Sequence, residues 1–195
     1  RENNIPEWFI ESCKKISYLF PRAHAVAYVM MAFRIAWFKV YHPLAFYAAY
    51  FSIRAKAFDL RIMTGGLKTQ LTEFNRIKAL DRAASPKDKD LMSALEVSME
   101  MYQRGYRFIN VDIQHSEARR FSIKDGALLP PFLAIDSLGE TVADAIVEER
   151  NERPFTSLKD LQRRCKVSNT IIDLMKELKC CGELPEDEQM SLFGA

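Results

Sequence analysis

Prolines divide this chain into segments of about helix length. Proline has no backbone N–H, so it fits the first turn of a helix but not the interior. Pro6 and Pro43 are therefore expected to start helices, and Pro21 to separate two of them. Three helices follow from this spacing, at residues 7–19, 22–40 and 44–54. Within 22–40 the residues Met30, Phe33, Trp37 and Val40 recur at helical spacing and are expected to form a core stripe.

The middle of the chain combines helical patterns with one hairpin pattern. Helices are expected at 68–82 and 86–105, the second with Ser85 as N-cap and a glycine at its end. Extended segments flank a Lys-Asp-Gly turn at 124–126, which predicts a small β-hairpin. Two prolines at 130–131 then separate a final helical unit, 132–182. We expect a mainly α-helical fold with a small β-hairpin.

Composition excludes some classes of protein and leaves others open. The net charge of +2 over 195 residues says little, but residues 1–58 carry eight Lys or Arg against three Glu, which suits phosphate. The four cysteines lack metal-ligand spacing, which favours reduced thiols and a cytoplasmic protein. Arg34 and Lys39 interrupt the apolar region 23–53, so we expect no membrane span. Because Arg1 is not an initiator methionine, we expect a fragment of a longer chain.

Residues 132–147 show the pattern of a helix, a tight turn and a second helix. Val142, Ala143, Ile146 and Val147 are expected to point inward. The segment resembles the helix-hairpin-helix module, which binds DNA backbone phosphate through N–H groups at a helix N-terminus, independently of sequence. The resemblance implies that the DNA-binding residues are Ser137, Leu138, Gly139, Glu140 and Thr141. A hairpin that only packs remains the alternative.

Two features of this segment bear on the hairpin assignment. Ser137 stands where the module usually has the first glycine, and Glu140 is one of several nearby acidic residues unfavourable to DNA. A capping box formed by Ser157 and Asp160 predicts the next helix. A second, more degenerate hairpin is expected at 167–169, with the first hairpin the better phosphate binder.

Arg22, His24 and Tyr28 lie at the start of a predicted helix. Helical spacing places His24 and Tyr28 on one face, where a cation, an imidazole and a ring suit a nucleotide. A satisfied core histidine beside a core tyrosine is the alternative. Residues 20–29 and 37–43 resemble the fingers of bacterial replicative DNA polymerase III α subunits. Residues 6–8 and 12–16, and the order of fingers, hairpin motif and terminal peptide, resemble the PolC type.

The resemblance extends to the end of the chain. Residues 189–193 resemble the pentapeptide by which replication proteins bind the sliding clamp β; these residues are Gln189, Met190, Ser191, Leu192 and Phe193. Gln189, Leu192 and Phe193 are the expected anchors, and the acidic run before them is expected to be a spacer. Five residues can also match by chance.

The resemblance implies a division of the chain into four parts. These are helical fingers at 1–107, a small β-hairpin and linker at 108–131, a tandem helix-hairpin-helix unit at 132–182 and a flexible clamp-binding tail at 183–195. The implied partners are incoming dNTP, duplex primer–template, clamp and the remainder of the polymerase, and no membrane. Catalytic carboxylates and Mg²⁺ would lie in a palm outside this chain, so it would be inactive alone and bind no cofactor itself.

Two other classes of function remain open at this point. A helix-hairpin-helix module of a repair or recombination protein would explain 132–182 but not the helix that starts at Arg22. A helical scaffold whose hairpins only pack would bind neither DNA nor a clamp.

Overall fold

The computed structural model describes residues 3–16 and 21–187, which divide into two units at Tyr41–His42. Each unit is considered by itself. The first contains helix α1 (Glu7–Lys15) and helix α2 (Arg22–Tyr41). The prediction for α2 is confirmed, whereas α1 is shorter than expected because Ile16 is already extended, with φ −91° and ψ 97°.

The prediction of a buried core stripe on α2 is wrong. Met30, Phe33, Trp37 and Val40 are between 49 and 73% exposed, and neither described helix of the first unit has a buried residue. Apolar residues such as Val26, shared around the whole circumference of α2, give the helix no distinct inner face. Among the described residues, α2 is also the helix long and apolar enough to cross a membrane by length and composition.

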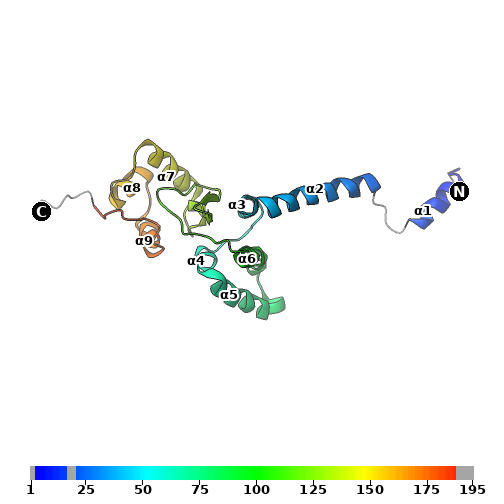
Figure 1. Cartoon of the computed structure of the whole chain (residues 1–195), viewed down its shortest axis with the longest axis horizontal. Coiled ribbons are helices and arrows are strands. Elements are labelled where there is room, and N and C mark those ends of the chain that lie inside the picture. Colours follow the sequence, from blue (N-terminus) through cyan, green and yellow to red (C-terminus); the bar gives the residue numbers. More distant parts are fainter. Residues whose placement is uncertain (1–2, 17–20, 188–195) are drawn as a thin grey trace, which may run out of the picture. The chain divides into compact units, whose positions relative to one another are not determined.

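The second unit starts at His42 and holds the remaining described elements (Figure 1). They are α3 (Pro43–Ile53), α4 (Leu60–Thr64), α5 (Gly66–Leu80), η1 (Asp81–Ala83), α6 (Pro86–Gln103), β1 (Ser122–Lys124), β2 (Ala127–Leu129), η2 (Phe132–Ala134), α7 (Glu140–Glu152), α8 (Leu158–Cys165) and α9 (Asn169–Glu177). The prediction of a mainly helical chain with one hairpin is confirmed.

The ends of α6 follow from local sequence. Ser85 and Asp88 form a capping box, in which the Ser85 hydroxyl accepts from the Asp88 N–H at 3.1 Å and Asp88 accepts from the Ser85 N–H at 3.0 Å. Gly105 stops the helix with φ +85°, and the Tyr106 N–H returns to the Met101 carbonyl at 3.1 Å. Both expected helix signals are therefore confirmed.

The hairpin is also as expected, and it has a third extended neighbour. Strands β1 and β2 pair antiparallel, with Ser122 opposite Leu129, and the turn residues Asp125 and Gly126 have positive φ. Phe108 bridges to Leu128 in parallel. The Ile109 N–H donates to the Leu128 carbonyl at 2.9 Å, which ties segment 108–113 to the hairpin.

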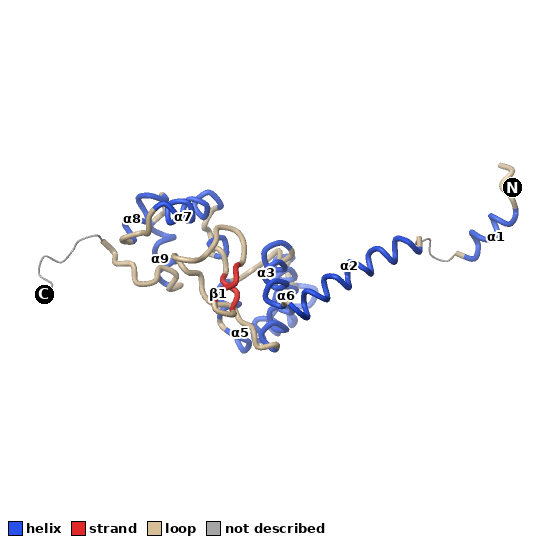
Figure 2. The backbone as a smooth tube through the Cα atoms, turned by 45° about the horizontal axis from the view of Figure 1, so that its top comes forward, coloured by secondary structure: helices blue, strands red, loops and turns tan. Residues whose placement is uncertain are grey.

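Two apolar clusters form the core of the second unit. One gathers α3, α5 and α6 around Tyr47, Met63 and Leu95, and the other gathers α7, α8 and α9 around Ile146 and Leu161. Figures 1 and 2 both show α7, α8 and α9 grouped together. The extended segment 108–113 contributes side chains to both clusters.

The acidic run at 183–187 differs from the expected free spacer. The Leu158 N–H, in the first turn of α8, donates to the Pro185 carbonyl at 2.9 Å. The residues expected to bind the clamp, 189–193, lie outside the described residues.

Candidate nucleic-acid interface

The first hairpin joins η2 to α7 through a short turn. The expected helix before it is a single 3₁₀ turn, Phe132–Ala134, because the backbone is already extended at Ile135, with φ −81° and ψ 123°. Ser137 has φ +64°, Leu138 is buried, and Gly139 is the N-cap of α7. The turn therefore anchors an apolar side chain and leads directly into a helix N-terminus.

Gly139 leaves the start of α7 open. Among the described residues, no side chain caps the helix there, and no heavy atom beyond the chain neighbours of Gly139 lies within 4 Å of the position that its Cβ would take. The first N–H groups of a helix have no partner within the helix and carry partial positive charge. An anion can therefore approach the backbone at Gly139, Glu140 and Thr141.

Ser137 departs from the module in side chain rather than in backbone. The left-handed φ of +64° is the conformation that glycine adopts without strain and that other residues adopt at a cost. The turn keeps this conformation although serine occupies the position. The inward positions on α7 also follow expectation, with Ala143 and Ile146 fully buried and Val142 and Val147 partly buried.

The second hairpin repeats the backbone of the first. Lys166 has φ +55°, Val167 is buried, and Ser168 is the N-cap of α9, which matches the order left-handed residue, buried apolar residue, N-cap. The N-cap φ and ψ are −76° and 156° at Gly139 and −70° and 155° at Ser168. The expected tandem arrangement is present in the backbone.

The two hairpins differ in charge. The first turn of α7 carries Glu140, whereas the first turn of α9 carries no acidic residue. Arg119 offsets part of the negative charge at the first hairpin, since it contacts Glu140 at 2.5 Å and also pairs with Asp144. At the second hairpin the exposed Lys166 lies within the turn itself.

Asp160 holds the start of α8 in place. Its side chain is fully buried and contacts Arg153, Arg163 and Arg164 at 3.2, 2.9 and 3.3 Å. Burial alone would raise the pKa of this carboxyl, but hydrogen bonds from the Thr156 N–H and the arginines hold the pKa below its usual value. The Asp160 N–H also donates to the Ser157 hydroxyl at 3.0 Å, as the expected capping box requires.

Arg150 follows the first hairpin in sequence, but its guanidinium makes contacts within the fold. Its guanidinium donates to the carbonyls of Ile113 and Ser116 at 3.1 and 2.8 Å and lies 5.9 Å from the centre of the Phe132 ring. Desolvation by burial lowers the pKa of Arg150. This arginine joins segment 113–116 to α7 and is committed to that contact.

The residues predicted to bind nucleotide lie on the first turns of α2. The His24 and Tyr28 rings stand edge to face, 5.4 Å apart, which confirms that they share one helical face. Arg22, His24 and Tyr28 are all exposed. Their role with nucleotide stays a prediction.

The carboxylates of Asp59 and Asp112 each have partners within the fold. Asp59 caps α4 by accepting from the Ile62 N–H, and Asp112 accepts from Lys124 at 2.8 Å and lies 2.8 Å from the His115 ring nitrogen. Within residues 3–16 and 21–187, no group of three His, Cys, Asp or Glu is placed to hold a metal ion.

Sequence reasoning missed two residues at this interface. Lys166 could have been found from register, because it precedes Val167 and Ser168 as Ser137 precedes Leu138 and Gly139. Arg119 gave no sequence signal, since it lies 21 residues before Glu140 and meets it only in the fold.

The chain is similar to known proteins over almost its whole length. A family model described as a helix-hairpin-helix motif matches residues 105–189, which include both hairpins. The chain is 48% identical over 193 residues to the protein named DNA polymerase III PolC-type of Caldanaerobacter subterraneus subsp. tengcongensis. The chain is homologous to PolC-type DNA polymerase III. It is also 48% identical over 196 residues to DNA polymerase III PolC-type of Streptococcus pyogenes serotype M1.

The homologous stretch is almost the whole of this chain but a small part of the PolC-type relatives. Each alignment covers 99% of the chain, and covers 14% of the Caldanaerobacter protein and 13% of the Streptococcus protein. The chain therefore spans about one seventh of the length of these relatives.

Proposed function

We propose that this chain is part of a replicative DNA-directed DNA polymerase, a nucleotidyltransferase of the PolC type, and that its tandem hairpins bind the backbone of duplex primer–template DNA. The observation that carries the proposal is the repeated hairpin backbone at Ser137–Gly139 and Lys166–Ser168, inside the region that matches the helix-hairpin-helix motif. In the described part of the chain, the first N–H groups of α7 have no side-chain cap. At α9 the Ser168 hydroxyl accepts from the Ile171 N–H at 3.4 Å and leaves the two preceding N–H groups without a helical acceptor. Two such N-termini suit two phosphate groups. Such contacts do not depend on base sequence.

The first unit would supply the nucleotide contacts. Arg22 and His24 would meet the triphosphate of incoming dNTP, and Tyr28 would pack against the nascent base pair, as in the fingers that residues 20–29 resemble. Their exposure and their position on successive turns of α2 support this assignment.

The last residues would bind the sliding clamp. Gln189 can donate and accept hydrogen bonds, and Leu192 and Phe193 can fill an apolar pocket. The chemistry itself, with its catalytic carboxylates and Mg²⁺, would belong to the palm of the full polymerase, in the cytoplasm and away from membranes. Homology to PolC-type polymerase over 99% of the chain favours this function over a separate repair module.

Gly139 provides the sharpest test of the hairpin role. Because space is open at its Cβ position and its φ is −76°, aspartate can replace it without strain and will cap α7 well. The new carboxylate would lie where a phosphate approaches the backbone. We expect Gly139→Asp to weaken duplex binding at low salt by about tenfold, as one lost contact of about 1.4 kcal/mol would do.

The isosteric variant Gly139→Asn is the matched control, since it also caps the helix but adds no charge. It should retain most of the binding. Equal binding by the aspartate and asparagine variants would count against phosphate at this hairpin, and so would binding of the parent chain that does not weaken with added salt.

The other two roles need their own measurements. Substitution of Arg22 or His24 in the full-length enzyme should raise the Michaelis constant for dNTP or lower turnover, and unchanged values would remove the triphosphate role. Replacement of Gln189, Leu192 and Phe193 together by alanine should abolish capture of this chain by the clamp. Retained capture would remove the clamp role and leave the DNA role standing.

A further inference from the structure

The acidic run 183–187 is bound to the tandem-hairpin unit by its backbone. The Leu158 and Lys159 N–H groups donate to the carbonyls of Pro185 and Glu186 at 2.9 and 3.2 Å. These N–H groups lie in the first turn of α8, where a helix leaves its own donors unpaired. Two carbonyls of the run therefore accept hydrogen bonds from N–H groups of α8 that have no acceptor within the helix.

Side chains of the run add contacts to two helices. Asp187 pairs with Lys159 on α8, and Glu186 pairs with Lys176 on α9 at 2.7 Å. Leu184 packs against the apolar cluster of α7–α9 and is partly buried. Each exposed ion pair stabilises weakly, but the two pairs, two hydrogen bonds and one apolar contact act on four consecutive residues, 184–187.

The run is bound at the end of α8 away from the second hairpin. It contacts Leu158 and Lys159 at the start of α8, whereas the hairpin turn begins at Lys166, just after α8 ends. At 1.5 Å per residue, the eight residues of α8 separate the two ends by about 10 Å. On α9 the contacting residue, Lys176, likewise lies at the end opposite the N-cap Ser168.

We infer that residues 183–187 form a docked strap that fixes where the clamp-binding peptide leaves this unit, away from the second hairpin turn, so that duplex and clamp bind together through a short tether. The inference rests on the proposed function for both its partners. With the strap docked, only Glu188 lies between Asp187 and Gln189. With the strap released, residues 183–188 would all be tether.

Tether length has a measurable consequence. The effective concentration of a tethered peptide falls roughly as the −3/2 power of tether length once the tether exceeds the span. With the strap docked, the tether runs from Asp187 to Gln189, which is two residues along the chain. With the strap released, it runs from Gly182 to Gln189, which is seven residues. The effective concentration should then fall roughly sevenfold.

The experiment compares affinity of this chain for free clamp with affinity for clamp threaded on an end-blocked duplex. The ratio of the two dissociation constants is the gain from simultaneous binding. The test variant is Glu186→Lys/Asp187→Lys, which reverses both ion pairs of the strap. The matched control adds Lys159→Glu/Lys176→Glu, which restores both pairs and the net charge of the parent chain.

Hydrogen exchange at the Leu158 and Lys159 amides reports docking independently of either partner. We expect the test variant to lose this protection and to lose roughly sevenfold in gain, with unchanged affinity for free clamp. The four-residue control should recover both. A further variant with five Gly and Ser residues inserted between Asp187 and Glu188 should keep protection and lose gain.

Each contrary outcome has a distinct meaning. Unprotected amides in the parent chain would overturn docking itself. Lost protection with unchanged gain would overturn the strap's role and leave DNA and clamp binding intact. A parent chain that binds no clamp, or no duplex, would overturn the proposed function, and the inference with it, whatever the amides show.

Discussion

Ser137 and Lys166 occupy equivalent positions in two successive hairpins, with φ of +64° and +55°. Each precedes a buried apolar residue and an extended N-cap that starts a helix. Neither is glycine, the residue that adopts this conformation most easily. Both hairpins therefore hold a non-glycine residue in the left-handed backbone conformation. The surrounding packing must offset the cost of that conformation.

The strain at Ser137 can be measured by substitution. A β-branched residue tolerates positive φ poorly, so Ser137→Val should lower the free energy of unfolding by about 1–2 kcal/mol. Ser137→Gly should leave it equal or slightly higher, because relief of strain opposes the added chain entropy of glycine. Urea unfolding of the three chains would check this. A valine variant as stable as the parent would mean that the turn is not strained.

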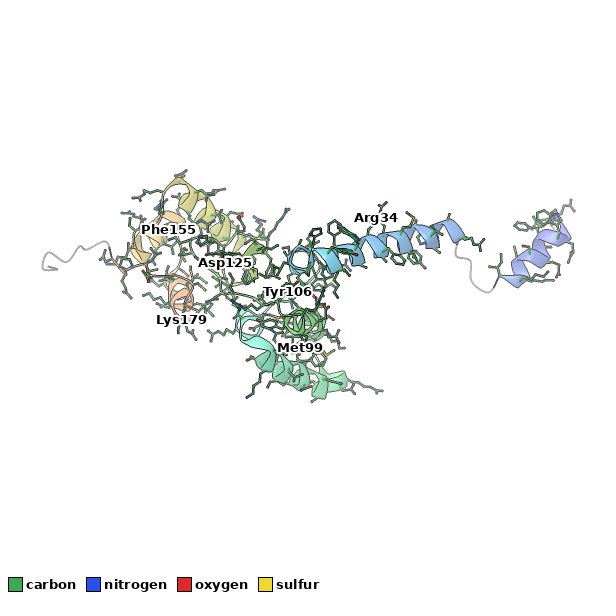
Figure 3. The ribbon with its side chains drawn as sticks, in the orientation of Figure 1. Arg34, Met99, Tyr106, Asp125, Phe155 and Lys179 are labelled. Atoms are coloured by element: carbon green, nitrogen blue, oxygen red, sulfur yellow. The ribbon has the colours of Figure 1, made fainter. Side chains whose placement is uncertain are left out.

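Lys166 should give the second hairpin a phosphate contact of its own. We expect Lys166→Ala to weaken duplex binding and to reduce the slope of log K against log salt by about 1, the value for one lost phosphate contact. Lys179 is the matched control, because it is also an exposed lysine with φ +57° but follows the far end of α9 (Figure 3). Lys179→Ala should leave the slope unchanged. Equal effects of the two variants would assign binding to general positive charge.

Asp160 should contribute to stability in a pH-dependent way. Loss of its hydrogen bonds to charged partners in Asp160→Asn should cost about 1.5–3 kcal/mol in the free energy of unfolding. Its pKa is lowered in the fold, so its contribution is present above the ordinary carboxyl pKa of about 3.9 and is lost as pH falls below that value. The stability difference between parent and variant, measured by urea unfolding, should therefore shrink below about pH 4. A difference that is constant down to pH 2.5 would contradict this assignment.

The cysteines should separate into one reactive and three protected thiols. Cys13 is exposed, whereas burial raises the pKa to about 12 for Cys165 and Cys180 and to about 11 for Cys181. At pH 8 a thiol with pKa 12 is thiolate in about one molecule in ten thousand. A thiol reagent should modify one residue rapidly, three more only after unfolding, and none rapidly in Cys13→Ser. Fast modification of a second thiol in the native chain would be the contrary result.

Features set by neighbouring residues could be predicted from the sequence. The capping residue Ser85, the Ser157–Asp160 pair, the Asp125-Gly126 turn and the stop at Gly105 all act within a few positions, and the structure has each of them. Candidate helices that start at Pro43 and Arg22 were predictable for the same reason. The second hairpin was also predictable from local sequence, because its turn residues follow the same order as those of the first.

Features that depend on distant contacts could not be predicted. The periodicity of α2 suggested a core stripe, yet Phe33 is 73% exposed and no residue of α2 is buried by the described part of the chain. The acidic residues near the first hairpin looked unfavourable to phosphate, and only the fold brings Arg119 to Glu140 and Asp144. The acidic run looked like a spacer because nothing local shows that Pro185 and Glu186 meet the unpaired amides of α8.

The extended segment 108–113 has a practical meaning for anyone who wishes to cut this protein into pieces. Phe108 belongs to the cluster of α3, α5 and α6, while Val111 and Ile113 belong to the cluster of α7–α9, and the Ile113 N–H donates to the Cys180 carbonyl at 3.0 Å. A boundary drawn at residue 131 would strip the hairpin unit of these side chains and expose the apolar surface they cover. Segment 108–113 therefore belongs to the cores of both halves of the second unit, and each half needs it to cover its apolar surface.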